Sequence, residues 1–587
     1  MIDFLPTPLF GQNLFITFWL SAVWVLSAGI TLGFVIAIVT YFKILILQRI
    51  PVLNSVASKR STFIVAGIGL TLVYFLLYVT VRYRGIEFLS SISWDDIRGM
   101  LFMLPICAIF GFGAWNLVSK KFQDDLTAQC TEGLPKWLCR ICVIFVAFFA
   151  LGFPLAKYNG FGAIKFVEKP VQMMESLARL PFAGKTDYVY SIEPSDENHS
   201  GDPVEVDFEG SELKSIFIRS TEPIELAAEP ISSDVEFVLP VDPSEEHLRF
   251  QQSAGERSMF QARVYTKLYI NNNGSDTAKV EFYTLTGPVD TEVAVIPPTA
   301  GFIFLCFFAP VLLAASLPKV SAISLSTFKT EISQPLYLLV LIFGAVFIVI
   351  SIYIPYNTFG EDIKMFKDSG LNLIRVMAIF TAIWAASKSV AEEIEGRTAL
   401  TVLSKPVSRR QFILGKFSGI AFAIGLLFIV LGLWFMIWTA YKPVYDGQES
   451  ANRLTDWLQP FQQSFNVVPG LILCFFEVLI FVAVSVAIST RLGVLPNFLI
   501  CATIFVLGHL TPQIVESSLG EFAPVQVFGQ LIATVFPVLD HFDIQAAISR
   551  GSSVPIDYLA EVLLYTVLYS TFALLGSLVF FEDRDLA

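Results

Sequence analysis

Charged residues are scarce in this chain of 587 residues. Only 15% of the residues are Asp, Glu, Lys or Arg, whereas 55% are hydrophobic and 14% are aromatic. An ordinary soluble domain carries about 25% charged residues, and a single compact core could not bury so many apolar side chains. The composition therefore excludes a soluble globular protein and predicts a chain that exposes much of its apolar surface to lipid.

The motifs of common catalytic and metal sites are also missing. No phosphate-binding G-x-x-x-x-G-K-[ST] loop occurs, because Gly415-Lys416 is followed by Phe417 and has Arg410 where the first glycine should be. The four histidines lack metal-binding spacing, and there is no G-x-S-x-G nucleophile motif. We therefore expect no catalytic residue, no metal and no cofactor on this chain, and no nucleic-acid partner.

Cysteine is absent between Lys157 and Pro298, and the seven cysteines lie in or beside apolar segments. No disulfide framework can therefore form in that intervening region. Cys139 and Cys142 form a CxxC pair to which we assign no role, because buried cysteine is the ordinary explanation.

Long apolar segments are what the chain has in quantity. A run of about 17 to 25 residues almost free of charge is long enough to cross a hydrocarbon layer about 30 Å thick. Such runs lie near 14–42, 61–81, 97–118, 137–155, 300–317, 335–354, 370–391, 412–440, 467–489, 493–510 and 558–581. The predicted fold class is an α-helical polytopic membrane protein with about 11 transmembrane helices.

Basic residues in the short loops predict the orientation, because Lys and Arg near helix ends are retained on the cytoplasmic side. Alternate loops carry them, at Lys43, Arg49, Lys59 and Arg60, at Lys120, Lys121, Lys136 and Arg140, at Lys319 and Lys329, at Arg397, Lys405, Arg409, Arg410 and Lys416, and at Arg491 and Arg584. The amino terminus is therefore expected outside and the carboxyl terminus in the cytoplasm.

The segment 157–298 has a different pattern, with period-two alternation typical of strands that bury one face. Val204–Phe208 is the clearest run, and the Asn-rich stretch at 271–274 supplies a turn. Further runs occur at 216–219, 235–239, 264–270, 278–284 and 292–296. We predict a small extracytoplasmic β-sandwich inserted between the fourth and fifth spans.

The β-rich segment is strongly acidic. It contains 24 Asp and Glu against 12 Lys and Arg, a net −12 that equals the formal charge of the whole chain. We interpret this as a solvated acidic surface, with attraction of a basic partner or substrate as the alternative. The predicted domains are a four-span membrane module at 1–156, the β-rich domain at 157–298, the fifth span at 299–318 and a six-span domain at 319–587.

The segment 392–416 is predicted to form a rigid hairpin between the seventh and eighth spans. The seventh span ends in an acidic turn, Gly396 loosens the helix, and Pro406 stops the short apolar piece 399–403. Ser408, with Gln411 three residues later, matches a capping box that starts the helix of the eighth span. A compact segment held by two membrane helices is suited to transmit force from a cytoplasmic partner.

The hairpin contains a Glu, a Gly-Thr pair separated by Arg397, a Leu-rich turn, Pro-x-Ser-Arg and Gly-Lys, and it resembles the type-2 ABC transporter permeases. The resemblance covers about 320–587 and includes a terminal Phe-x-x-Arg-Asp-Leu that begins at Phe581. An amphipathic stretch is similar to the family's interfacial helix and comprises Leu325, Phe328, Ile332 and Leu336. Residues 1–318 do not match, so we interpret them as an accessory module.

In that family the hairpin docks on a separate ATPase subunit as the coupling element. The resemblance implies ATPase-coupling roles for Glu393, Glu395, Thr398, Leu403, Pro406, Ser408, Arg409, Arg410, Gly415 and Lys416. It also implies a cytoplasmic ABC ATPase that holds ATP and Mg, and a second permease half in a homodimer or heterodimer. The implied location is a bacterial-type plasma (inner) membrane.

Two charged residues fall inside predicted spans. Glu477 lies near the middle of the ninth span, where an ionised carboxylate costs about 2.5 kcal/mol or more. A place on the translocation path and a structural hydrogen bond between helices are both open interpretations for Glu477. Arg375 could pair with Glu477, but we favour snorkelling toward the outer end of the seventh span.

The leading functional hypothesis is the membrane subunit of an ATP-driven ABC exporter. The alternative is a non-transporting membrane scaffold or sensor that uses the β-domain as a ligand-binding module. A membrane enzyme is disfavoured because no catalytic group is evident.

Overall fold

A computed structural model of the chain divides into two compact units. The membrane unit comprises Met1–Phe149 and Thr299–Ala587, and the β unit comprises Ala150–Pro298. The structure describes residues 21–51, 60–83, 107, 111, 117, 122–158, 177, 180, 184–194, 201–210, 212–230, 238–243, 248–251, 264–287, 291–354, 362–395, 407–449, 458–518, 536–544 and 554–582.

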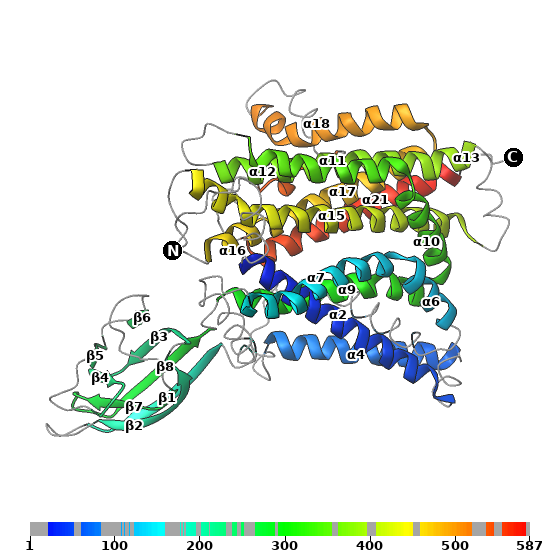
Figure 1. Cartoon of the computed structure of the whole chain (residues 1–587). Helices are drawn as coiled ribbons and strands as arrows, with labels where there is room; N and C mark the ends of the chain where they lie inside the picture. Colours follow the sequence, from blue (N-terminus) through cyan, green and yellow to red (C-terminus); the bar gives the residue numbers. More distant parts are fainter. Residues whose placement is uncertain are drawn as a thin grey trace. The chain divides into compact units, whose positions relative to one another are not determined.

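The membrane unit is helical (Figure 1). Its first part contains α2 (Ser21–Gln48), α4 (Arg60–Tyr83), α6 (Gln123–Glu132), α7 (Leu134–Tyr158) and α9 (Ile296–Ser316). The second part contains α10 (Pro318–Ile332), α11 (Pro335–Ile352), α12 (Asp362–Ala386), η5 (Ser387–Glu392), α13 (Glu393–Glu395), α15 (Arg409–Glu449), α16 (Leu458–Phe465), α17 (Val468–Ser489), α18 (Val494–Ser518), η6 (Asp540–Phe542) and α21 (Ile556–Glu582).

Seven helices among the described residues are long and apolar enough to cross a membrane, or eight if the bent pair α6–α7 forms one span. Two shorter apolar helices, Ile64–Leu76 and Val494–Leu510, coincide with two more predicted spans. The predicted span at 97–118 lies outside the described residues except for Cys107, Gly111 and Leu117. The chain is therefore a helical membrane protein with about 7 to 8 candidate spans.

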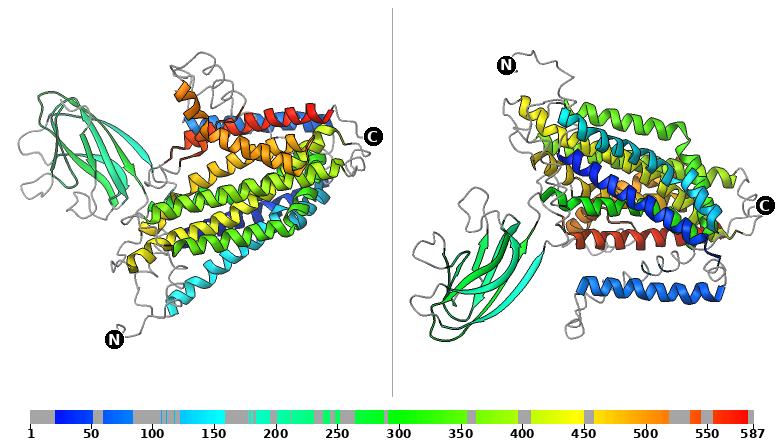
Figure 2. Two further views of the ribbon diagram at one scale, coloured as in Figure 1. Left: turned by 90° about the horizontal axis from the view of Figure 1, so that it is seen from above. Right: turned by 60° about the horizontal axis from the view of Figure 1, so that its bottom comes forward.

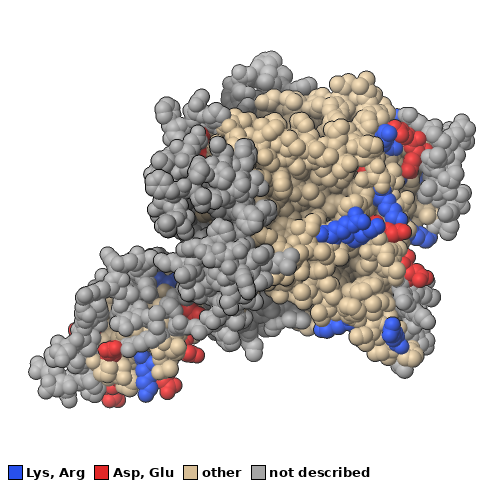
Figure 3. Space-filling view, in the orientation of Figure 1, with Lys and Arg blue, Asp and Glu red and all other residues tan. Residues whose placement is uncertain are grey.

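The distribution of charge over this unit fits a lipid-facing belt. Figure 3 shows an almost uncharged surface over the helices, with Lys, Arg, Asp and Glu gathered at the end where α10 and α13 lie. Large apolar side chains are exposed on the helices, among them Phe572 on α21 and Leu339 on α11. In lipid such side chains need no protein partner, because the hydrocarbon tails are equally apolar.

The centre of the membrane unit is built around α15, a helix of 41 residues. It packs against α10, α11, α12 and α17, and α17 in turn packs against α12 and α21. The two views of Figure 2 show α12, α15 and α17 running side by side. Phe366, Phe435 and Phe481 are fully buried among these helices, which form one continuous apolar core.

Small residues allow α10 to cross α15 closely. A Cβ atom added at Gly415 would lie 2.6 Å from the Cβ of Ile323, and one at Gly419 would lie 2.7 Å from the carbonyl oxygen of Ser324. Both distances are shorter than a van der Waals contact. Glycine is therefore required at both positions for the backbones to approach this closely.

The predicted apolar stripe on the interfacial helix is only partly correct. Phe328 is buried as expected, but the rest of the buried face of α10 includes the small polar residues Ser321, Ser324 and Thr327. Leu336 lies on α11 instead, because α10 ends at Ile332 and the chain turns before Pro335. The close crossing with α15 requires small side chains on the face of α10 that meets it, and Ser324 and Thr327 lie there.

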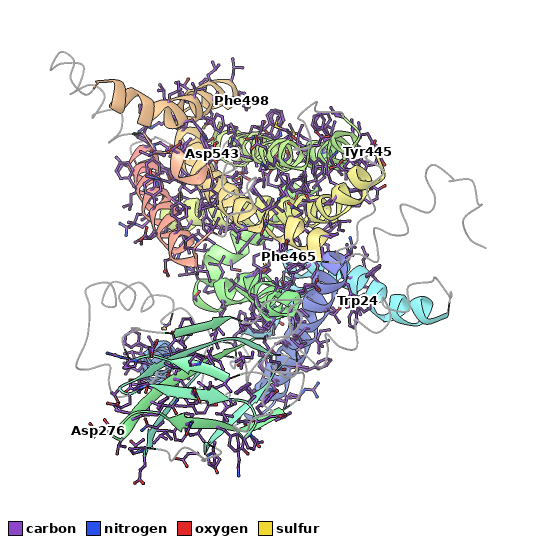
Figure 4. The ribbon with its side chains drawn as sticks, turned by 90° about the vertical axis from the view of Figure 1, so that its left-hand side faces the viewer. Trp24, Asp276, Tyr445, Phe465, Phe498 and Asp543 are labelled. Carbon is purple, nitrogen blue, oxygen red and sulfur yellow. The ribbon has the colours of Figure 1, made fainter. Side chains whose placement is uncertain are left out.

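The amino-terminal helices pack onto the later ones within the same unit. Helix α2 meets α16 and α15, and Figure 4 labels Trp24 and Phe465 where α2 and α16 approach each other. Helix α6 contacts α10, where Gln129 donates a buried hydrogen bond of 2.7 Å to Ser321 and Lys329 forms an ion pair with Glu132.

The β unit contains two four-stranded antiparallel sheets with strand orders β1-β8-β3-β6 and β2-β7-β4-β5. The strands are β1 (Lys185–Ile192), β2 (Asp202–Glu209), β3 (Leu213–Ser220), β4 (Ile224–Ala227), β5 (Val238–Val241), β6 (Leu248–Gln251), β7 (Val264–Asn272) and β8 (Ala278–Thr286). Alternate residues such as Ile216, Ile218 and Leu268 are buried in one apolar cluster. The predicted two-sheet β region is confirmed.

The predicted turn after β7 is also present. The side chain of Asn272 is buried, accepts a hydrogen bond of 2.9 Å from the Gly274 amide and donates one of 3.1 Å to the Ile192 carbonyl. The predicted strand at 292–296 is wrong, because Thr291–Val295 forms the 3₁₀ turn η4 that leads into α9. Pro297 and Pro298 follow in the first turn of α9, where the missing amide hydrogen is tolerated.

Candidate functional site

The predicted hairpin joins the end of α12 to the start of α15, and we call residues 393–416 the coupling segment. Helix α12 continues through the π-helical turn η5 into α13, and α15 starts at Arg409. The Ser408 amide donates a hydrogen bond of 3.1 Å to Oε1 of Gln411, and the Gln411 amide donates one of 3.3 Å to Oγ of Ser408. These reciprocal bonds confirm the capping box.

An ion pair connects the two sides of the coupling segment. Nζ of Lys416 on α15 lies 2.6 Å from Oε1 of Glu393 on α13. Lys416 is buried, with its Nζ 5.5 Å from the ring centroid of Phe412, whereas Glu393 is half-buried. A charged hydrogen bond sheltered from water is stronger than an exposed one, so this pair holds the end of α13 against α15.

Arg409 connects the coupling segment to the last helix. Its Nη1 donates a hydrogen bond of 3.0 Å to the carbonyl oxygen of Phe581, and its guanidinium lies 5.5 Å from the centroid of the Phe581 ring. The Phe581 ring is fully buried and stacks on Phe412 at a centroid distance of 5.9 Å. The first residue of the terminal Phe-x-x-Arg-Asp-Leu stretch therefore anchors α21 to the start of α15.

The structure separates the predicted coupling residues into distinct environments. Ser408 and Arg410 are exposed, Gly415 is packed against α10, and Lys416 is buried in its ion pair. Thr398, Leu403 and Pro406 lie outside the described residues, and so does the side chain of Glu395. Among the described members, Ser408 and Arg410 are the ones with exposed side chains, and Oγ of Ser408 already accepts the capping hydrogen bond.

A buried polar cluster that the sequence analysis missed surrounds the π-helical turn. Nδ2 of Asn497 on α18 donates hydrogen bonds of 2.8 Å to Ser387, 2.8 Å to Ser485 and 2.9 Å to Ser489. All four residues are fully buried. One signal was available, because Ser485 and Ser489 are four residues apart and share a face of an apolar helix. The cluster ties α17 and α18 to the end of α12.

A second site lies deeper among the helices, and we call Arg375, Glu477, His509 and Asp543 the intramembrane charge cluster. Nη1 of Arg375 lies 3.6 Å from Oε2 of Glu477 and 4.0 Å from Oδ2 of Asp543, and Nε2 of His509 lies 3.8 Å from Oε1 of Glu477. Arg375 also donates a hydrogen bond to Asn372. Asp543 is labelled near α18 and α21 in Figure 4.

The prediction that Arg375 snorkels to the outer end of its helix is wrong. Helix α12 begins at Asp362 and not near 370, so Arg375 lies more than three turns inside the helix. Its side chain is 8% exposed and faces Glu477, which is completely buried. Pairing was the alternative interpretation, and the structure supports it.

Several buried polar atoms of the intramembrane charge cluster lack a hydrogen bond. Both carboxylate oxygens of Glu477 and Nε of Arg375 are buried without a hydrogen-bond partner. Such atoms are uncommon in native proteins, where a water molecule, an ion or a functional role can account for them. The described residues contain no group of three or more His, Cys, Asp or Glu side chains arranged to hold a metal ion.

The family to which the chain belongs follows from comparison with known proteins. A family model described as ABC-2 family transporter protein matches residues 136–586. The match begins well before residue 320, so it includes the β unit and α9, which the sequence resemblance left in an accessory module. No curated protein gives a significant match to the chain. Since the family model covers more than half of its length, this chain belongs to the ABC-2 family of transporter membrane proteins.

Proposed function

We propose that the chain is the permease subunit of an ATP-driven exporter, in which a separate ABC ATPase holds ATP and Mg and drives substrate through the membrane. The observation that carries this proposal is the coupling segment, held between α12 and α15 by the capping box and by the Glu393–Lys416 ion pair. In a permease of this family a segment at this place receives the ATPase.

The contacts of the coupling segment suit it to pass motion into the membrane helices. Lys416 ties α15 to α13, and Arg409 ties α15 to α21. A force applied at the exposed Arg410 would therefore move α12, α15 and α21 together. Rigid connections of this kind are required to convert closure of a partner into rearrangement of a packed bundle.

The proposed topology follows from loop charge. We place the amino terminus outside, the carboxyl terminus and the coupling segment in the cytoplasm, and the β unit outside a bacterial-type plasma membrane. About eleven spans remain the proposed count, six of them in 319–587. Six spans make half of an ABC-2 channel, so a second permease half is required, either another copy of this chain or a relative.

The intramembrane charge cluster is the proposed polar element of the translocation path. Glu477 and Arg375 lie on neighbouring helices α17 and α12, and α12 moves with the coupling segment in this scheme. Unpartnered buried oxygens on Glu477 would gain hydrogen bonds if a polar substrate group or water entered.

Affinity purification of the solubilised chain, followed by identification of co-purifying proteins and an ATPase assay, tests the proposal. We expect recovery of an ATP-binding subunit that is lost from the variant R410E. The matched control is R491E, which reverses another exposed arginine on the same proposed side but outside the coupling segment.

Retention of the ATPase by R410E would contradict the docking assignment. Recovery of no ATPase with the unaltered chain would favour the alternative function, a membrane scaffold or sensor that works through the β unit.

A further inference from the structure

Glu331 is a buried carboxyl group beside the coupling segment. It lies one residue before the end of α10, a helix that packs against α15, and is 3% exposed. Its Oε2 accepts a hydrogen bond of 2.9 Å from Nε2 of Gln334, whereas its Oε1 is buried without a partner. Gln334 in turn accepts a hydrogen bond of 3.1 Å from Trp384 on α12. Glu331 therefore touches the junction of α10, α12 and α15.

The groups that face Glu331 come from three elements. Lys416 of α15 and Lys388 of η5 favour its ionised form, while Glu392 of η5 and Glu393 of α13 disfavour it. Burial is the largest influence and raises the pKa of Glu331 to about 8. The carboxyl end of a helix carries a partial negative charge, which also disfavours a carboxylate at this place.

Lys416 is the cation that interacts with both Glu393 and Glu331. In the structure its ammonium pairs with Glu393 at 2.6 Å and also interacts electrostatically with Glu331, one oxygen of which has no hydrogen bond. A protonated Glu331 has no net charge with which to attract Lys416. An ionised Glu331 is a buried carboxylate that needs a cation, and Lys416 is a buried cation within its field.

We propose that Glu331 is a positioning residue of the coupling segment, which competes with Glu393 for Lys416 and releases α13 from α15 when it ionises. The proposal depends on the function proposed above for the segment. In the neutral state Lys416 holds α13, and the segment is firmly connected to α15. In the ionised state Lys416 pairs with Glu331, which connects α15 to α10. The contact between α15 and α13 then weakens.

A double-mutant cycle tests this exchange without any partner protein. Melting temperatures of the full-length chain in detergent are measured for E393Q, K416M and the double variant, and the non-additive part reports the Glu393–Lys416 interaction. We expect this part to fall by at least half between about pH 6.5 and about pH 9.5, the two sides of the Glu331 titration. In an E331Q background it should be equal at both pH values.

The matched control is the Lys442–Asp446 pair, which lies on the same helix at 2.7 Å. The non-additive part of the double-mutant cycle for Lys442 and Asp446 should be the same at both pH values. A Glu393–Lys416 interaction that does not change with pH in the otherwise unaltered chain would overturn the proposal, and so would an equal change in the E331Q background. The pH dependence of the Glu393–Lys416 interaction is measured without any Glu331 variant. The proposal can therefore be refuted even if E331Q folds poorly.

The consequence for coupling is measured on the assembled complex. We expect the ATPase activity of the complex that contains E331Q to lose the pH dependence that the unaltered complex shows over the same range, while binding of the ATPase is retained. An unchanged profile would refute the positioning role. Failure to recover any ATPase would refute the proposed function instead, and the double-mutant cycle would still decide the exchange.

Discussion

Arg375 and Glu477 offer the sharpest test of how the membrane core is held together. Replacing Arg375 with Met keeps an unbranched apolar stem, shortens the side chain and removes the cation between two carboxylates, Glu477 at 3.6 Å and Asp543 at 4.0 Å. Replacing Glu477 with Gln removes one carboxylate and leaves Arg375 with Asp543. R375M therefore leaves two carboxyl groups without this cation, whereas E477Q leaves a cation that still has one carboxylate partner.

The structure sets the expected magnitudes. Glu477 is fully buried, so R375M leaves a carboxyl group without its counter-charge and should lower the unfolding free energy by about 3–5 kcal/mol. E477Q keeps a polar group of the same shape and should cost roughly 1–3 kcal/mol. The double variant R375M/E477L leaves no unpaired buried charge at these two positions, so it should be more stable than R375M alone.

Titration of the purified chain with a denaturing detergent, followed by a folding-sensitive fluorescence signal, supplies these free energies. The order expected is R375M least stable, then R375M/E477L, then E477Q. If R375M lowered stability by less than about 1 kcal/mol, the pairing would be unimportant and Arg375 would behave as an exposed, snorkelled side chain. If the effects of R375M and E477L, each measured as a single variant, simply added in R375M/E477L, the interaction itself would be refuted.

Three further outcomes are expected. G419A should destabilise the chain by about 1–3 kcal/mol because the new methyl group would meet α10, whereas G425A, whose Cβ would meet only Phe475 at 3.9 Å, should be neutral or slightly stabilising in the same unfolding assay. Because burial raises the pKa of Glu331 from 4.5 to about 8, the folded state binds the proton more tightly than the unfolded state does. The unfolding free energy should therefore fall by roughly 1 kcal/mol for each pH unit between these values, and E331Q should remove this dependence in thermal unfolding. R409A should loosen the carboxyl-terminal helix, seen as faster amide hydrogen exchange near Phe581, while R410A should leave that exchange unchanged.

The architecture could largely be predicted from the sequence because it depends on local properties. A span needs only enough consecutive apolar residues, and the predicted runs at 335–354, 412–440 and 467–489 coincide with α11, α15 and α17. The capping box at Ser408 and Gln411 is a contact between residues three apart, so its spacing was sufficient. Strand alternation in 204–208 likewise needed no knowledge of the partner strand.

Other predictions failed or stayed incomplete because the deciding contact is distant in the chain. Arg375 and Glu477 are 102 residues apart in the numbering, and whether an arginine deep in a helix snorkels or pairs depends on which helix packs beside it. The run at 292–296 alternates like a strand, yet it pairs with none of the described strands, and Thr291–Val295 forms a 3₁₀ turn.

The sequence by itself determined that this chain is a membrane protein, that it contains a two-sheet β region, and that the segment around Glu393 and Arg409 joins two long helices. Tertiary structure alone decided what each charged side chain does. Lys416 is buried and pairs with Glu393, Gly415 lies where α10 crosses α15, and Glu331 is a buried acid on α10. Periodicity specifies which residues share a face, but burial and charge pairing depend on which helix meets that face.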